Sequence, residues 1–228
     1  KPKYTQKALE KIPYVGNGYI IKGSQLADAG DFTGAKDAFL KSYAIKSMPE
    51  LGEAAIMDTS MLFNAAIMSM KGKDFESAAE IFEQVVGMGY NGFVFTGTSA
   101  VSGETIPLRS KADADKQMEL QMITEYAKSE TLRPSTYSSL ISCYKQTENK
   151  DKYKSTLKAA RTEFPEDVDL INLEIQDYLD AEQYDEALAI LDEAIAQSPD
   201  SKLYYYVKGS LYQNHKKDIE LALANYEK

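Results

Sequence analysis

The sequence predicts an all-α chain built from stacked antiparallel helix pairs, and a repeated interval is the main reason. Pro165 and Pro199 are 34 residues apart, and Tyr144, Tyr178 and Tyr212 follow one another at the same interval. Apolar residues between these markers recur at helical spacing. A fixed period of this length is typical of units that bury their apolar faces against neighbouring units rather than in one closed core.

The unit between the two prolines shows how each pair is expected to fold. Ile175 and Tyr178 share one face of a first helix, and a short polar turn follows. Ala187 and Leu191 lie one turn apart on a second helix, where the small side chain allows close approach and the large one fills the space between helices. Pro199 ends the unit, because proline lacks an N–H and its ring clashes with the preceding turn.

These features resemble the tetratricopeptide repeat, a family of 34-residue helix pairs. The small–large–small series of the family's second helix appears as Ala187, Leu191 and Ala194, and its Gly-then-Tyr pair appears as Gly209 and Tyr212. The resemblance implies a right-handed superhelix with a concave groove lined by the first helices. It also extends to exported bacterial members with a divergent segment between repeats, which favours a periplasmic or cell-surface location. The family's Trp is absent, and its position is held by Tyr137, Ile171 and Tyr205.

We expect a single repeat domain over residues 1–228, as a fragment of a longer chain, because no polar capping helix follows the last pair. Before the first pair, a helical run from Thr5 to Lys11 stops before Pro13, and Gly16–Gly18 is expected to form a turn. The predicted helix pairs cover residues 17–46, 55–88, 135–164, 168–198 and 202–228.

An irregular insertion at residues 89–112 interrupts the repeats. Its glycines break helices, and the alternation of residues 93–96 predicts a strand. We therefore expect a short β-hairpin around 93–107. An extra helix is expected at 113–129, where Met118, Met122, Ile123 and Tyr126 form an apolar face.

Two positions disturb the register of the later pairs. Strict register places Tyr153 in the slot that small residues normally occupy. The alternative lengthens the preceding turn by about three residues and matches Tyr153 to Tyr184, and the polar run at 146–152 favours this alternative. In the last pair, the spacing from Gly209 to Ala222 is one residue longer than the family pattern.

Composition excludes some classes of function. The net charge is −9 and the isoelectric point is about 4.8, with no basic stripe of the kind that nucleic-acid binding requires. No apolar run reaches the roughly 18 residues of a membrane span. Paired acids such as Asp177 and Asp180 lack apolar neighbours that would shift their pKa, and are interpreted as a charged outer face.

No enzyme activity, cofactor or metal is predicted. Residues 97–105 depart from a phosphate-binding loop, since Glu104 stands where Lys is required, and residues 113–119 lack the Gly of a calcium loop. His215 is the single histidine and lies in a polar turn. Cys143, without a histidine nearby in the sequence, is interpreted as a packing residue rather than a nucleophile.

The predicted function is a non-catalytic scaffold that binds a protein or peptide in the concave groove, where amides and hydroxyls can pair with a peptide backbone. The alternative is an extracytoplasmic protein that binds a small ligand, for example a glycan, on Tyr206 and nearby amides. Self-association through the uncapped C-terminal end is a further expectation. The groove positions are Ser138, Ser142, Lys145, Asn172, Gln176, Tyr206, Ser210 and Gln213.

Overall fold

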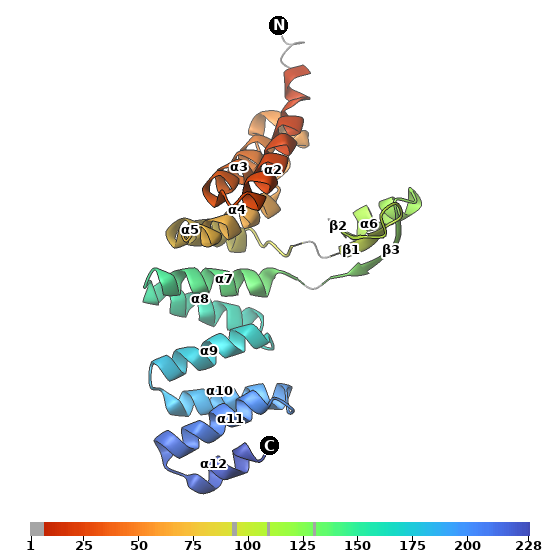
Figure 1. Cartoon of the computed structure of the whole chain (residues 1–228). Helices are drawn as coiled ribbons and strands as arrows, with labels where there is room; N and C mark the ends of the chain where they lie inside the picture. The colour runs from red at the N-terminus through yellow and green to blue at the C-terminus, as the bar shows by residue number, and fades with distance from the viewer. Residues whose placement is uncertain (1–6, 93–94, 109, 130) are drawn as a thin grey trace. The chain divides into compact units, whose positions relative to one another are not determined.

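The computed structural model describes residues 7–92, 95–108, 110–129 and 131–228, and the chain divides into two compact units. The first unit covers residues 1–150 and the second covers residues 151–228. Each unit consists mainly of antiparallel helices, and the first also contains a small sheet (Figure 1). The predicted class of stacked helix pairs with a β-hairpin is confirmed. The single repeat domain over the whole chain stays a prediction.

Five helices of the first unit pack in chain order, each on the next. The turns inside the first two pairs are each closed by a side-chain cap: the Asp31 carboxylate accepts a hydrogen bond from the Gly34 amide at 2.9 Å, and the Asp74 carboxylate accepts one from the Ser77 amide at 3.2 Å. The helices are α2 (Ile12–Asp28), α3 (Phe32–Lys46), α4 (Thr59–Lys71), α5 (Phe75–Gly87) and α7 (Arg133–Gln146).

The first helix starts earlier than predicted. Pro13 does not end a helix but lies in the first turn of α2, where its missing N–H has no helical partner to lose. Gly16 is buried inside α2 rather than in a turn. A Cβ at this position would lie 2.6 Å from Cγ of Lys46, so glycine allows α3 to approach closely. The predicted helical run begins in residues 1–6, which lie outside the described residues.

The long connection between α3 and α4 contains a short 3₁₀ segment, η1 (Pro49–Ala54). It is closed by a buried ion pair in which Lys46 Nζ lies 3.3 Å from Asp58 Oδ2. Lys46 is 4% exposed, so this charge depends on its carboxylate partner to remain in the interior.

The insertion between α5 and α7 contains the predicted hairpin, a short helix and a third strand. Strands β1 (Phe95–Ser99) and β2 (Thr105–Leu108) pair antiparallel, and residues 93–94 of the predicted strand lie outside the described residues. Helix α6 (Lys111–Glu119) follows, and strand β3 (Ile123–Lys128) then pairs with the other side of β1. The sheet order is β2-β1-β3.

The prediction of one helix over 113–129 is wrong. The helix ends at Glu119, and Gln121 has a φ of 53°, which turns the chain back toward the sheet. Ile123 is 3% exposed and packs with Leu108 and Ala114, which are fully buried. Pairing with β1 and burial of this side chain outweigh the local helical spacing, because strand propensity depends mainly on tertiary packing.

The second unit continues the helix pairs. Its core is an apolar cluster that includes Ile171 and Leu191 from the middle pair and Tyr204 from the next. The elements are α8 (Lys150–Glu163), which begins at the unit boundary, α9 (Val168–Asp180), α10 (Tyr184–Gln197), α11 (Lys202–Leu211), the π-helical turn η2 (Tyr212–Lys216) and α12 (Ile219–Tyr226).

Tyr153 occupies the slot of strict register, and the longer turn that we favoured is wrong. Helix α8 begins at Lys150, so Tyr153 is its fourth residue, as Ala187 is the fourth residue of α10. The ring is 7% exposed, whereas Ala187 is fully buried. The polar run at 146–152 therefore contributes Gln146 to the end of α7 and residues 150–152 to the start of α8, instead of extending the turn.

The extra residue between Gly209 and Ala222 lies next to a change of helix type. The chain passes from α11 into η2, whose wider turn takes up an added residue without breaking the helix. Lys217 then adopts a left-handed φ of 58° and ends the turn. A Cβ on Gly209 would lie 2.6 Å from Cε1 of Tyr226, so the small residue permits α12 to pack on α11.

Candidate functional site

The predicted groove residues of the first unit lie on α7 and differ in exposure. Lys145 is exposed, and Ser138 and Ser142 are half-buried. The Ser138 hydroxyl oxygen is buried and finds no hydrogen-bond partner among the described residues. This hydroxyl therefore does not line an open surface, contrary to the prediction for Ser138.

The predicted groove residues of the second unit lie mostly on exposed helix surfaces. Asn172 and Gln176 are exposed on α9, and Gln176 Nε2 donates a hydrogen bond of 2.6 Å to Oδ1 of Asp180. Tyr206 on α11 is 64% exposed. Its ring centroid lies 5.8 Å from that of Tyr226.

Local hydrogen bonds orient two more of these side chains. The Tyr226 hydroxyl donates to Oε1 of Gln213 at 2.9 Å, and Asn214 Nδ2 donates to the Ser210 hydroxyl at 3.0 Å. Gln213 lies in η2 rather than in a regular α-helix. The amide and hydroxyl groups of this end are therefore held by their neighbours, which reduces the conformational entropy lost when a ligand binds.

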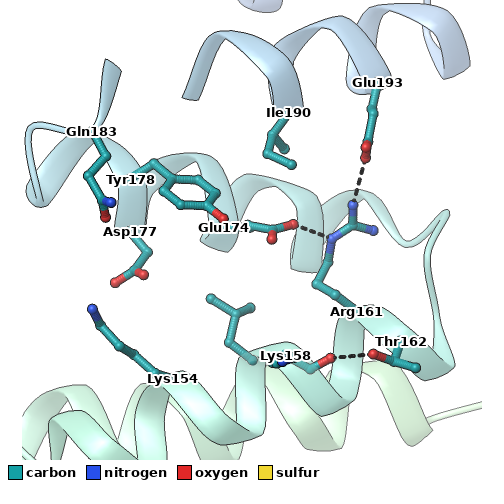
Figure 2. Close-up of a pocket in the computed structure, with 11 residues that line it drawn as sticks. Lys154, Lys158, Arg161, Thr162, Glu174, Asp177, Tyr178, Gln183, Ile190 and Glu193 are labelled. Carbon is teal, nitrogen blue, oxygen red and sulfur yellow. Dashed lines mark hydrogen bonds and ion pairs between the residues drawn. The ribbon is translucent and has the colours of Figure 1, made fainter. Parts of the chain in front are cut away.

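A separate hollow of about 540 Å³ lies within the second unit, lined by side chains of α8, α9 and α10, with α9 running between the other two helices (Figure 2). We call it the α8–α10 hollow. Its volume is within the range of ligand-binding pockets. It is lined by Lys154, Leu157, Lys158, Arg161, Thr162, Glu174, Asp177, Tyr178, Gln183, Ile190 and Glu193.

Arg161 organises one end of the α8–α10 hollow. Its Nε lies 2.6 Å from Oε2 of Glu174 on α9, and one terminal nitrogen lies 3.1 Å from Oε2 of Glu193 on α10. The other terminal nitrogen donates to the carbonyl oxygen of Pro165. The Arg161 side chain is 11% exposed, so one planar cation joins three consecutive helices and its own following turn.

The other end of the hollow holds charges that are not paired. Figure 2 shows the Lys154 side chain directed toward Asp177 with no ion pair between them. Within the described parts of the chain, no ion pair joins Lys154, Lys158 or Asp177 to another residue. Gln183, at the turn before α10, adds an exposed amide to this end.

Tyr178 lies between the two ends of the hollow, close to several carboxylates. Burial, followed by the nearby carboxylates of Glu174 and Glu186, raises the pKa of Tyr178 above its ordinary value. The phenol is therefore neutral at physiological pH and can donate a hydrogen bond.

Three features of the described residues bear on the candidate metal and nucleophile sites. These residues contain no group of three or more His, Cys, Asp and Glu side chains arranged for a metal ion. Burial raises the pKa of the Cys143 thiol to about 11, which keeps it protonated and poorly nucleophilic. The imidazole of His215 stacks on the Tyr184 ring with centroids 3.7 Å apart.

Sequence reasoning placed its candidate site on the first helices and missed the α8–α10 hollow. A signal was present: Lys154, Lys158 and Arg161 recur at intervals of four and three residues, which places them on one face of α8. Asp177 was interpreted as part of a charged outer face, and its placement across from Lys154 depends on how two helices pack.

No helix in the described part of the chain combines the length and hydropathy needed to cross a bilayer. Neither a protein-family model nor a curated protein matches the sequence.

Solved structures match the fold over almost the whole chain. A MamA crystal structure aligns with a TM-score of 0.57 at 15% identity, covering 96% of this chain and 90% of MamA. YrrB, described as a TPR protein with an unusual peptide-binding site, aligns with a TM-score of 0.54 at 15% identity, covering 96% of this chain and 87% of YrrB. MamA from Desulfovibrio magneticus RS-1 aligns with a TM-score of 0.52 at 13% identity, covering 93% of this chain and 91% of that MamA chain. Together with the helix pairs, these alignments show that the chain has the tetratricopeptide-repeat fold.

Proposed function

We propose that this protein is a non-catalytic scaffold that binds an extended peptide segment of a partner protein on the exposed faces of α9 and α11. The observation that carries the proposal is the character of these faces. Asn172 and Gln176 expose neutral amides on α9, and Tyr206 exposes most of its ring on α11. Amides supply both donors and acceptors for a peptide backbone, and an exposed tyrosine is a common anchor in protein interfaces.

The scaffold supports such binding through its rigidity. Helix α9 packs on α10 and α10 on α11, so the exposed side chains project from elements that are already ordered. A ligand then loses mainly its own conformational freedom on binding. The similarity to YrrB, described as a TPR protein with an unusual peptide-binding site, supports a peptide as the ligand class.

The test is capture of a partner from the native lysate by the wild-type chain and by the variant Asn172→Ala, Gln176→Ala, Tyr206→Ala. We expect the wild type to retain a partner that this groove variant loses, with unchanged helicity in circular dichroism.

The matched control removes the same three residue types from an exposed helix elsewhere, through Asn17→Ala, Gln25→Ala and Tyr14→Ala on α2. The control variant should capture the partner as the wild type does. Equal capture by the groove variant would show that α9 and α11 are not the binding surface.

A second candidate function, binding of a glycan, is favoured by one specific feature. Tyr205, Tyr206 and Tyr226 surround a hollow of about 350 Å³ together with Asn225 and Lys202. Aromatic faces with a few polar groups at the rim suit a small polar ligand. Screening the chain on a glycan array separates the two functions, because a bound glycan that is lost in Tyr206→Ala, with no captured peptide, would favour this candidate.

A further inference from the structure

We propose that the α8–α10 hollow is a second binding site, for a peptide segment that carries an acidic side chain next to an apolar one. This site is distinct from the surface proposed above. Asn172 and Glu174 are two residues apart on α9, which places their side chains roughly 160° apart around the helix. The hollow includes Glu174, whereas Asn172 does not line it.

The charges of the hollow select the sign of the ligand. The single positive charge of Arg161 is paired with two carboxylates, those of Glu174 and Glu193, so this end carries a surplus negative charge and disfavours an anion. Lys154 and Lys158 are exposed and make no ion pair with the described residues, and one unpaired carboxylate, that of Asp177, lies opposite Lys154 (Figure 2). Two unpaired ammonium groups on α8 against one unpaired carboxylate favour an acidic side chain along the α8 wall of the hollow.

The middle of the hollow is apolar. Leu157 is 5% exposed, Ile190 is half-buried, and Figure 2 shows the Tyr178 ring beside Ile190. An aliphatic or aromatic side chain next to the acidic residue would remove the exposed parts of Ile190 and Tyr178 from water, above the buried Leu157. The Asp177 carboxylate and the Gln183 amide then remain as acceptors for backbone N–H groups of the same segment.

The form of the hollow favours a segment of polypeptide over a small molecule. Lys154, Lys158, Gln183 and Glu193 on its rim are all exposed, so the hollow is an open trough rather than an enclosed cavity. The ion pairs of Arg161 hold its three walls together. Such a preformed trough suits a short extended peptide with one charged and one apolar anchor.

The test starts from a phage library of random 12-residue peptides. Selection is made on the whole chain carrying Asn172→Ala, Gln176→Ala and Tyr206→Ala. No captured peptide can then depend on the groove surface of α9 and α11 proposed above. We expect the selected peptides to share an acidic residue beside an apolar one. Their synthetic forms should bind roughly tenfold more weakly when Lys154→Glu and Lys158→Glu are added.

A charge swap makes the test specific. A selected peptide whose acidic residue is replaced by Lys should bind the Lys154→Glu, Lys158→Glu chain better than the parent peptide does. The matched control is Lys22→Glu with Lys71→Glu, which changes the net charge equally at exposed lysines of the first unit and should leave binding unchanged.

Three results would overturn the proposal: failure to select any peptide, selection of peptides without an acidic residue, or equal binding by the Lys154→Glu, Lys158→Glu chain. None of them bears on the groove, because the capture experiment for the groove uses the wild-type chain.

Discussion

Arg161 and Glu174 form the central ion pair of the second unit, with Arg161 Nε 2.6 Å from Glu174 Oε2. The two residues belong to consecutive helices, α8 and α9, and their side chains are 11% and 21% exposed. Because the same guanidinium reaches Glu193 on α10, a single side chain couples three helices. The pair also forms one end of the α8–α10 hollow, so it links the stability of the unit to the shape of its binding surface.

Replacing Arg161 by Met should destabilise the protein. The substitution leaves the carboxylate of Glu174 partly buried without its partner, which we expect to cost about 2 kcal/mol. The measurement is the urea dependence of unfolding, followed by circular dichroism. The control is Lys111→Met, which removes an exposed ion pair to Asp115 and should leave stability nearly unchanged. Equal effects of the two substitutions would show that Arg161 does not couple the helices.

Tyr153 should make stability depend on pH under alkaline conditions. Burial, followed by the carboxylates of Asp177 and Asp180, raises its pKa from 10.0 to about 12. Between these pH values the unfolded chain has lost this proton and the folded chain retains it, so the free energy of unfolding falls as pH rises. The contribution is at most about 1.4 kcal/mol per pH unit.

Tyr153→Phe should therefore make the fall between pH 10 and pH 12 less steep. Tyr90, whose pKa burial and Asp58 raise to about 12, provides an independent comparison: Tyr90→Phe should produce a similar reduction, and the two should add. Urea unfolding at several pH values measures the slope. A slope in Tyr153→Phe equal to that of the wild type would contradict the assignment.

Two glycines of helix α2 should respond to alanine in opposite directions. A Cβ at Gly23 would lie 2.8 Å from Cε1 of Phe39, a ring that is 5% exposed. Gly23→Ala should therefore cost about 1–3 kcal/mol through overpacking. No atom lies within 4 Å of a Cβ at Gly18, so Gly18→Ala should stabilise the helix by up to about 1 kcal/mol. Thermal unfolding measures both, and a stabilising Gly23→Ala would refute the close contact.

The inserted sheet should depend on Ile123. This side chain is 3% exposed and packs on Leu108 and Ala114, so Ile123→Ala should destabilise the sheet by about 2–4 kcal/mol. Native-state hydrogen exchange should show faster exchange in β1 while the amides of α5 and α7 remain protected. The exposed neighbour Thr124→Val serves as the control and should change little. A loss of protection that spread equally into α5 and α7 would show that the sheet does not open as a separate unit.

The helix pairs were predictable because their signals are local. Apolar spacing, the small slot at Ala35 and Ala187, and the capping residue Asp31 each act within a few residues of the chain. The start of α2 was missed although its signal was also local, because Pro13 can either end one helix or begin the next.

The exposure of the candidate groove residues was predictable only in part, and their role in binding stays a prediction. The exposure of Asn172, Gln176 and Tyr206 agrees with a surface role. The buried hydroxyl of Ser138 does not, because the depth of a half-buried position on α7 depends on what packs over it. The α8–α10 hollow combines residues from three helices, and no interval in the sequence specifies that Lys154 faces Asp177.

The sequence alone determined the repeat period, the helix pairs and the presence of a hairpin, since each follows from residue types a few positions apart. Only the tertiary structure decided that residues 123–128 form a strand, that Tyr153 fits a slot for small residues, and that Arg161 joins three helices. Spacing such as that of Met118, Met122 and Tyr126 suits a helix. Pairing with a distant strand and burial of Ile123 nevertheless contribute more free energy than local propensity does, and those contacts exist only in the folded chain.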